Sequence, residues 1–198
     1  MGIQVEESNA EKAGREILQL LFVGRVARVR RIELLLQAVE KLTIPFHLTI
    51  VGGEEKTSSV TRSGYLNELK GLVRSLDLKS RITFSGRKSP EEIKEYFKKA
   101  DIFLYSSKYE NFGQPLLEAG AHGLPIVSTS VGIARDIILE GETGYVIPDS
   151  PGVISDRILS LKDEKTRKKM GTQIKNLIKE KFDWNNIMSQ YMSLYNSL

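Results

Sequence analysis

Short apolar runs alternate along this chain with longer segments in which apolar residues recur every three or four positions. The short runs are rich in Leu, Ile, Val and Phe, a composition typical of strands that are buried on both faces of a parallel sheet. They predict six strands, over residues 17–24, 46–53, 81–86, 101–107, 125–130 and 144–148.

The intervening segments have the pattern of amphipathic helices. "RIELLLQAVEKL" and "GYLNELKGLVRSLDL" repeat apolar residues at helical spacing, and "SPEEIKEYFKKA" opens with a capping serine, a proline and two acids. Beyond residue 150 the strands stop, and "VISDRILSLK", "EKTRKKMGTQIKNLIKEKF" and "WNNIMSQYMSLYNSL" predict further helices. The alternation predicts an α/β domain with a six-stranded parallel sheet, helices on both faces and extra carboxyl-terminal helices.

Length and composition limit the possible classes of protein. With 198 residues, 40% of them hydrophobic, we expect one domain over 17–198 and an amino-terminal extension over 1–16. The absence of cysteine excludes disulfides, thiolate catalysis and zinc ribbons, and suits a reducing cytoplasm, where we place the chain. No leader or membrane-spanning run is present, so we expect a soluble protein. The formal charge of +4 permits anionic partners such as phosphate without specifying nucleic acid.

The residues that follow the first four strands are candidates for a ligand site, because ligands bind at the carboxyl ends of strands in an open parallel sheet. "GRVARVRR", "GGEE" and "GRKSP" each begin with glycine, namely Gly24, Gly52 and Gly86, and Arg25 and Arg87 come next in two of them. Glycine permits close approach of backbone to a ligand; alternatively, these glycines let strands turn into loops.

The fourth segment places two acids around a predicted helix start. "YENFGQPLLEAGAHGLP" predicts a helix from Gly113 or Gln114, with Pro115 in its first turn. The free amides and positive dipole end of such a helix bind anions such as phosphates. Glu110 precedes this helix and Glu118 lies about one turn inside it, so the acids flank the anion site. Carboxylates suit vicinal diols, which indicates a nucleotide-sugar with one acid on the ribose and one on the sugar.

Other features have plainer interpretations. "RVARVRR" is also consistent with a solvated or nucleic-acid-binding face. Glu118 and His122 have a metal-ligand spacing, but with two histidines and no cysteine we favour a hydrogen-bonded pair on one helix. We expect the last apolar helical stripe, capped by Asp183, to pack in the core; if part of it is exposed, the chain should self-associate. Its members are Trp184, Ile187, Met188, Tyr191, Tyr195 and Leu198.

Five blocks together resemble a known family. "FVGRVARVRRIELLLQAV", "LTIVGG", "ITFSGR", "ADIFLYSSKYENFGQPLLEAGAHGLPIVSTSVG" and "GETGYVIP" are similar in order and spacing to the carboxyl-terminal, donor-binding domain of group 1 glycosyltransferases. These are retaining enzymes of the GT-B fold, related to glycogen synthases, sucrose synthases and bacterial mannosyltransferases. The resemblance runs from about residue 17 to the end, and the acids Glu110 and Glu118, with seven residues between them, are its most specific element.

The resemblance implies a Rossmann-like domain, one half of a GT-B fold, and a role for each matching residue. Glu110 would be the catalytic acid that touches the transferred sugar, and Glu118 would hold the ribose. Arg25 and Arg30, the latter at a lysine position, would bind the diphosphate. The remaining donor-binding residues would be Gly24, Gly52, Gly86 and Arg87 in the turns, the last two by the base, with the backbone at Phe112, Gly113, Gln114, Pro115 and Leu116. The resemblance implies no metal and no cofactor, because arginines and the helix end neutralise the phosphate charge.

Three positions depart from the family pattern. The usual Lys-Gly pair reads Arg30-Arg31, so Arg31 either alters the phosphate loop or points to solvent. Asn111 replaces a glycine, which is tolerable if its φ is positive. A glycine-pair loop reads "VGIARD", with Ile133 as its second residue.

The family's amino-terminal domain, which carries the acceptor site, has no counterpart in this sequence, which begins at about the interdomain linker. We therefore expect the sugar-donor half of an enzyme that transfers a hexosyl group to a sugar, lipid or glycan acceptor. Its partners would be a nucleotide-sugar and the missing domain, with no nucleic acid, and the full-length enzyme could alternatively be peripheral at the inner membrane face. A non-catalytic nucleotide- or nucleic-acid-binding module, or an epimerase-like domain, are the alternatives.

Overall fold

Six parallel strands form one sheet in the order β3-β2-β1-β4-β5-β6. The computed structural model describes residues 2–5, 16–54 and 64–197. The strands are β1 (Leu18–Val23), β2 (Phe46–Val51), β3 (Ile82–Gly86), β4 (Ile102–Tyr105), β5 (Ile126–Thr129) and β6 (Gly144–Ile147). Each lies within its predicted range, so the six predicted strands are confirmed.

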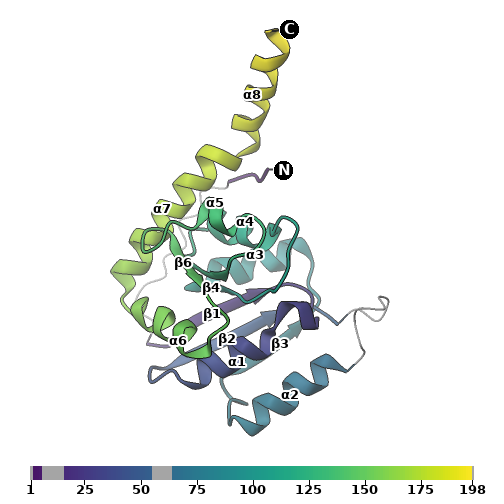
Figure 1. Ribbon diagram of the computed structural model, residues 1–198, viewed down its shortest axis with the longest axis vertical. Helices are drawn as coiled ribbons and strands as arrows, with labels where there is room; N and C mark the ends of the chain where they lie inside the picture. Colours follow the sequence, from purple (N-terminus) through teal and green to yellow (C-terminus); the bar gives the residue numbers. More distant parts are fainter. Residues whose placement is uncertain (1, 6–15, 55–63, 198) are drawn as a thin grey trace.

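Helices cover both faces of the sheet (Figure 1). They are η1 (Arg28–Arg30), α1 (Ile32–Glu40), α2 (Tyr65–Ser75), α3 (Pro90–Lys99), α4 (Gln114–Ala121), α5 (Ala134–Ile137), α6 (Pro151–Ser160), α7 (Glu164–Phe182) and α8 (Trp184–Asn196). Helices α1, α2 and α6 lie on one face; α3, α4 and α5 lie on the other, where α7 packs against α4. The predicted Rossmann-like α/β architecture is confirmed, whereas the short helices η1 and α5 were not predicted.

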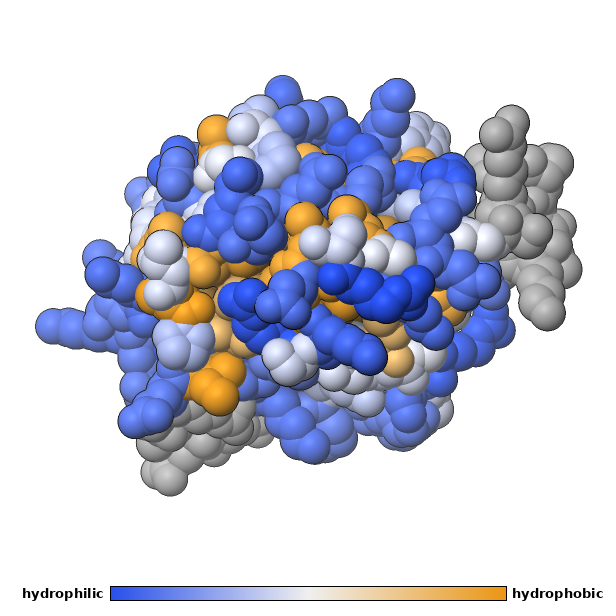
Figure 2. Space-filling model, turned by 90° about the horizontal axis from the view of Figure 1, so that it is seen from below, coloured by the Kyte–Doolittle hydropathy of each residue, from blue (hydrophilic) through white to orange (hydrophobic). Residues whose placement is uncertain are grey.

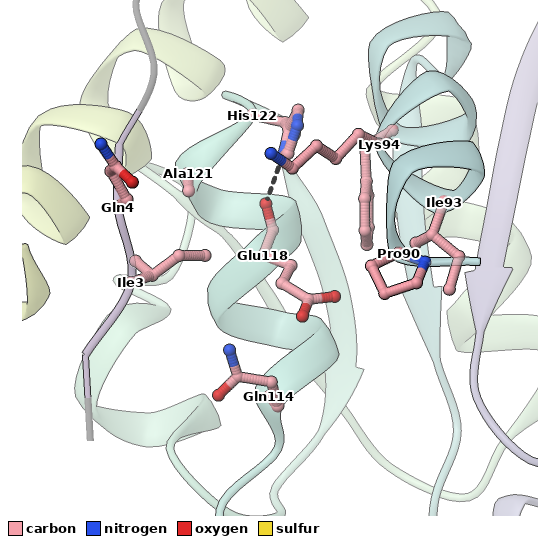
Figure 3. Close-up of a pocket in the computed structure, with 10 residues that line it drawn as sticks. Ile3, Gln4, Pro90, Ile93, Lys94, Gln114, Glu118, Ala121 and His122 are labelled. Carbon is pink, nitrogen blue, oxygen red and sulfur yellow. Dashed lines mark hydrogen bonds between the residues drawn. The ribbon is translucent and has the colours of Figure 1, made fainter.

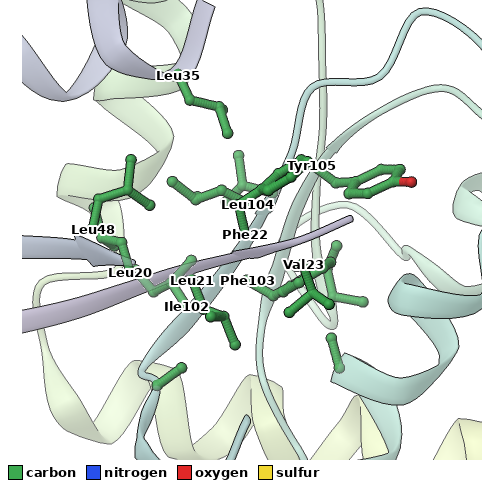
Figure 4. Packing of buried hydrophobic residues seen from close by; sticks show 14 of the residues in the cluster. Leu20, Leu21, Phe22, Val23, Leu35, Leu48, Ile102, Phe103, Leu104 and Tyr105 are labelled. Atoms are coloured by element: carbon green, nitrogen blue, oxygen red, sulfur yellow. The ribbon is translucent and has the colours of Figure 1, made fainter. Parts of the chain in front are cut away.

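The centre of the core lies between β1 and β4, which pair with each other (Figure 4). Because helices cover both faces, every residue of β4 and every residue of β1 except Gln19 is buried, which explains why these sequences lack an alternation of apolar and polar residues. Tyr105 ends β4 fully buried, with its ring stacked on Phe22 at 5.7 Å and on Phe103 at 5.9 Å between ring centroids. The Tyr105 hydroxyl therefore lies at the carboxyl edge of the sheet.

Helix α8 extends away from the body of the domain (Figure 1). The Asp183 carboxylate caps it by accepting from the Asn185 N–H at 2.9 Å, as predicted. No described residue of α8 is buried, and Trp184 is 46% and Tyr195 75% exposed. The prediction that this stripe packs in the core is therefore wrong for its described members; Leu198 lies outside the described residues. Helix α7 and the amino-terminal segment adjoin the start of α8, where Ile3 pairs with the α7–α8 junction.

The face of the molecule that points away from α8 is mainly hydrophilic, with apolar residues in patches between charged ones (Figure 2). None of the helices described is both long enough and apolar enough to pass through a bilayer.

Candidate functional site

The strand ends are drawn together by close backbone contacts. Gly24 N–H donates to the Val51 carbonyl at 3.0 Å, and Gly52 N–H donates to the Gly86 carbonyl at 2.9 Å. A Cβ on Gly52, whose φ is +143°, would lie 1.8 Å from the Gly24 carbonyl oxygen. Glycine is therefore required at position 52 because two chain segments approach each other closely there. This agrees with the alternative in which the glycine serves the turn from strand to loop.

Arg30 and Glu110 meet at the carboxyl edge between β1 and β4. Arg30 is 8% exposed, and its Nη1 forms an ion pair with Glu110 Oε2. The same nitrogen donates to Ser107 Oγ at 3.0 Å and to the Tyr109 carbonyl at 3.2 Å. Burial lowers the pKa of Arg30, yet a guanidinium keeps its charge at neutral pH. Its buried Nε has no hydrogen-bond partner.

Tyr105 provides a second contact to the same carboxylate. Its hydroxyl donates to Glu110 Oε2 at 3.0 Å, and burial raises the pKa of the phenol. The Glu110 side chain also lies against the start of α4, since a Cβ on Gly113 would be 3.6 Å from Glu110 Cγ. Tyr105 was not predicted as a site residue. The available signal was an aromatic residue with a polar end at the last position of an apolar strand, five residues before Glu110.

The Arg31 side chain does not point to solvent, since it is only 17% exposed. Its Nε donates to the Ser106 carbonyl at 2.9 Å, and its Nη1 forms an ion pair with Asp149. Ser106 Oγ in turn donates to the Arg30 carbonyl at 2.7 Å. The φ of Arg31 is +47°, in the left-handed region, which is where glycine, the residue of the family pattern, is favoured. Arg31 therefore ties the η1–α1 corner to β4 and to the loop before α6.

The start of α4 is as predicted, with Gln114 as its first residue, Gly113 as its cap and Pro115 in its first turn. The Leu116 N–H already donates to the Gly113 carbonyl at 2.9 Å, so it is not free for a ligand. Ile133 N–H donates to the Phe112 carbonyl at 2.8 Å, which packs the loop after β5 against this turn.

Asn111 does not have the positive φ under which asparagine was considered a tolerable replacement for glycine. Among the described non-glycine residues only Arg31 and Asp77 have a positive φ. The backbone at position 111 therefore accepts an ordinary residue without strain, and glycine is not required there.

Glu118 lies on another side of α4, where it lines a cavity of about 320 Å³ between α3 and α4 (Figure 3). The lining residues are Ile3, Gln4, Pro90, Ile93, Lys94, Phe97, Gln114, Glu118, Ala121 and His122. Burial raises the pKa of Glu118. A hydrogen bond from Gln114 acts in the opposite direction, because it stabilises the charged carboxylate. The His122 ring contacts the Glu118 backbone carbonyl at 2.8 Å and stacks on Phe97 at 5.1 Å, which supports the helix-pair interpretation.

Positive charge surrounds the Glu110 side of the site. Arg25 is exposed, and its charge lowers the pKa of Tyr105 in opposition to the effect of burial. Arg87 is exposed beside Gly53, whose Cβ would be 3.6 Å from Arg87 Cβ. Over residues 2–5, 16–54 and 64–197, no three His, Asp or Glu side chains converge in a way that could hold a metal ion.

The arginine-rich segment is not a uniform basic face. Arg30 is buried on Glu110, and the exposed Arg28 pairs with Glu68 and lies over the Tyr65 ring at 5.2 Å. Because three of its arginines, Arg28, Arg30 and Arg31, are engaged by acids of the chain, the segment does not present the free row of charges that tracking a nucleic-acid backbone requires.

The structure thus brings Arg30 and Glu110 together beside the amino end of α4, with Arg25 within electrostatic reach of Arg30 and Tyr105. It places Glu118 on the α3 side of the same helix, with Arg87 on the turn before α3. A ligand that touches both acids must pass across the start of α4. Such a ligand needs an anionic centre for the arginines and the helix end, and a hydroxyl-bearing group on either side.

The family profile and the relatives similar in sequence indicate the same protein family. The profile of the family "Glycosyl transferases group 1" matches residues 5–177. The chain is 30% identical over 180 residues to N-acetyl-alpha-D-glucosaminyl L-malate synthase of Bacillus anthracis, which covers 89% of this chain and 44% of that protein. It is 28% identical over 183 residues to D-inositol 3-phosphate glycosyltransferase of Corynebacterium urealyticum, 89% of this chain and 42% of that protein.

Solved structures share the fold. Sucrose-phosphate synthase from Thermosynechococcus elongatus superposes with a TM-score of 0.81 at 28% identity, over 92% of this chain and 45% of that one. Anabaena Alr3699/HepE, solved with UDP and glucose, has a TM-score of 0.81 at 20% identity, over 92% and 49% of the two chains. The chain spans less than half the length of these relatives. Since the family profile covers most of its residues, the chain belongs to the group 1 glycosyltransferases.

Proposed function

We propose that this chain is the sugar-donor-binding half of a retaining glycosyltransferase, and that it binds a nucleoside-diphosphate hexose at the carboxyl edge of the sheet. One observation carries the proposal. Glu110, fixed by Arg30, and Glu118, facing the cavity between α3 and α4, lie on two sides of the amino end of α4. A diphosphate at the helix end would place a hexose toward one acid and a ribose toward the other.

The phosphate charge would be met by protein groups. Arg25 is exposed and suited to direct contact, whereas Arg30 contributes its charge from a buried position while it holds Glu110. The first amides of α4 and its dipole add to this field. We therefore propose transfer without a divalent metal, which predicts that chelator leaves the activity of the two-domain enzyme unchanged.

The two acids would have separate roles. Glu110 would accept a hydrogen bond from the transferred hexose near the reacting carbon, and Glu118 would accept from the ribose hydroxyls. Arg87, on the turn that precedes α3, would lie by the base. Support for this class of ligand comes from the solved relative Alr3699/HepE, which holds UDP and glucose.

The acceptor site would come from the rest of the enzyme. The relatives are more than twice as long as the matched region, and α8 presents exposed apolar side chains with no cover in the described chain. We propose that an amino-terminal domain packs on α8, on the same chain or on a separate one. The isolated chain should therefore bind a nucleotide-sugar weakly and transfer nothing efficiently.

Calorimetric titration with UDP, GDP and ADP, and with UDP-glucose, GDP-mannose and ADP-glucose, tests the proposal. Glu118→Ala should weaken binding of the selected nucleotide about tenfold to a hundredfold, the loss of one or two hydrogen bonds to a charged acceptor. Glu110→Gln should reduce only the additional affinity due to the hexose. Glu142→Ala, in the exposed turn that leads into β6 at the opposite edge of the sheet, is the control and should change neither. Equal affinities for all variants would contradict the assigned roles.

A further inference from the structure

We infer that Tyr105 is a positioning residue for Glu110, which it orients toward the hexose of the bound nucleotide-sugar. The inference rests on the proposed function and goes beyond it, because it assigns a role to a strand residue that lies outside the acid pair and the arginine turn.

The phenol is fixed in place by the core. Tyr105 is fully buried at the end of β4, and its ring is nearly parallel to Phe22 and Phe103, at interplanar angles of 15° and 19°. A ring stacked on both neighbours has little freedom to change rotamer. Its hydroxyl therefore occupies a defined point at the sheet edge, 3.0 Å from Glu110 Oε2.

Two donors converge on one carboxylate oxygen. Arg30 Nη1 and the Tyr105 hydroxyl both contact Glu110 Oε2, and Arg30 Nη1 is itself fixed by Ser107 and Tyr109. An ion pair alone permits a carboxylate to rotate between equivalent arrangements, whereas a second donor from another direction defines the plane of the group. Glu110 Oε1 is then presented to accept from a ligand hydroxyl.

The phenol remains a donor under ordinary conditions. Burial raises the pKa of Tyr105, in opposition to the positive charges of Arg30 and Arg25. The group therefore keeps its proton at neutral pH and donates it to the carboxylate. A phenylalanine in this position would keep the ring stack and fill the same space, so the hydroxyl is the part of the side chain that packing does not explain.

Tyr105→Phe removes only this hydroxyl and keeps the ring stack. In the isolated chain, the ratio of affinities for the nucleotide-sugar and its bare nucleoside diphosphate should fall about threefold to tenfold, with the affinity for the diphosphate unchanged. The probes are UDP with UDP-glucose, or GDP with GDP-mannose or ADP with ADP-glucose if guanine or adenine is selected. In the Glu110→Gln background the same change should leave the ratio as it is, because the group being oriented has gone.

Tyr65→Phe is the matched control. Tyr65 is also a buried tyrosine, but its hydroxyl accepts from the Ile32 N–H at the start of α1 at 3.0 Å. The Tyr65→Phe variant should have a lower thermal midpoint but an unchanged affinity ratio. This result distinguishes a positioning role of a tyrosine hydroxyl from a general loss of stability.

The outcomes are distinguishable. If Glu110→Gln lowers the ratio of affinities for nucleotide-sugar and nucleoside diphosphate but Tyr105→Phe leaves it unchanged, the inference is overturned. The proposed function is then unaffected. Equal weakening of both ligands by Tyr105→Phe also overturns it, since that result indicates a structural role alone. Absence of binding of all six ligands to the wild-type chain at millimolar concentration overturns the proposed function, and this inference with it.

Discussion

Replacing Arg30 with methionine would test how the candidate site is held together. The change keeps a side chain of similar length while removing the charge that faces Glu110. The Arg30 and Glu110 side chains are 10% and 16% exposed, so solvent cannot fully replace either partner. After the replacement, Glu110 retains the hydrogen bond from the Tyr105 hydroxyl but has lost its ion pair.

The expected cost follows from this burial. Breaking a buried ion pair by removing one partner costs about 3–5 kcal/mol, and the residual exposure of Glu110 places Arg30→Met near the lower end, about 3 kcal/mol. The Tyr109 carbonyl that Arg30 also contacts keeps a hydrogen bond from Ser107 Oγ at 2.7 Å, so its loss adds little. For a domain of this size, about 3 kcal/mol lowers the melting midpoint by roughly 6–12 °C.

Urea unfolding at pH 7, followed by circular dichroism, measures the change, with Lys168→Met as the control. Lys168 pairs with Glu164 on the surface, at 65% and 37% exposure, and should contribute less than about 1 kcal/mol. The double variant Arg30→Met/Glu110→Gln should recover much of the stability, because no uncompensated charge is left. An Arg30→Met variant no less stable than the control, or strictly additive effects in the double variant, would refute the reasoning.

Three further predictions follow from other contacts. Because burial raises the pKa of Glu118 above its unfolded value, the native chain binds more protons than the unfolded chain between these two pKa values, and stability falls as pH rises through that window. Glu118→Gln should therefore raise the urea midpoint at pH 7, with a gain that disappears below about pH 4, while it weakens nucleotide binding; a lowered midpoint at pH 7 would contradict this. Asp149→Asn should cost less than about 1 kcal/mol in urea unfolding, since the carboxylate is 65% exposed, and a larger loss would show that its pair with Arg31 is a major support of the η1–α1 corner. The exposed α8 should make the isolated chain self-associate with rising concentration, measured by sedimentation, and Tyr195→Lys should reduce this; a monomer at all concentrations would count against it.

The strands were predictable because buried strands have apolar sequences that can be recognised locally. The run in β4 has only apolar or aromatic residues, and the run in β1 is apolar except at Gln19, a composition that a strand covered on both faces requires. The start of α4 was predictable for a similar reason, because Gly113 and Pro115 are local signals of a helix start. The acids on either side of it could be placed from their spacing alone.

The contacts that orient the site were not predictable, because they join segments far apart in the chain. Arg31 reaches Asp149 across 118 positions, and Arg30 reaches Ser107 across 77. Neither pairing leaves a periodic signal in the sequence. The stripe of α8 shows the converse limit: its periodicity correctly predicted an amphipathic helix, but an apolar face does not specify what covers it.

The most direct test of the proposed function is a crystal structure of this chain with the nucleoside-diphosphate hexose that it binds best. We predict the diphosphate at the amino end of α4 beside Arg25, the ribose hydroxyls on Glu118 and the hexose within hydrogen-bond reach of Glu110. A ligand bound elsewhere, or one in this cleft whose hexose and ribose touch neither acid, would contradict the account.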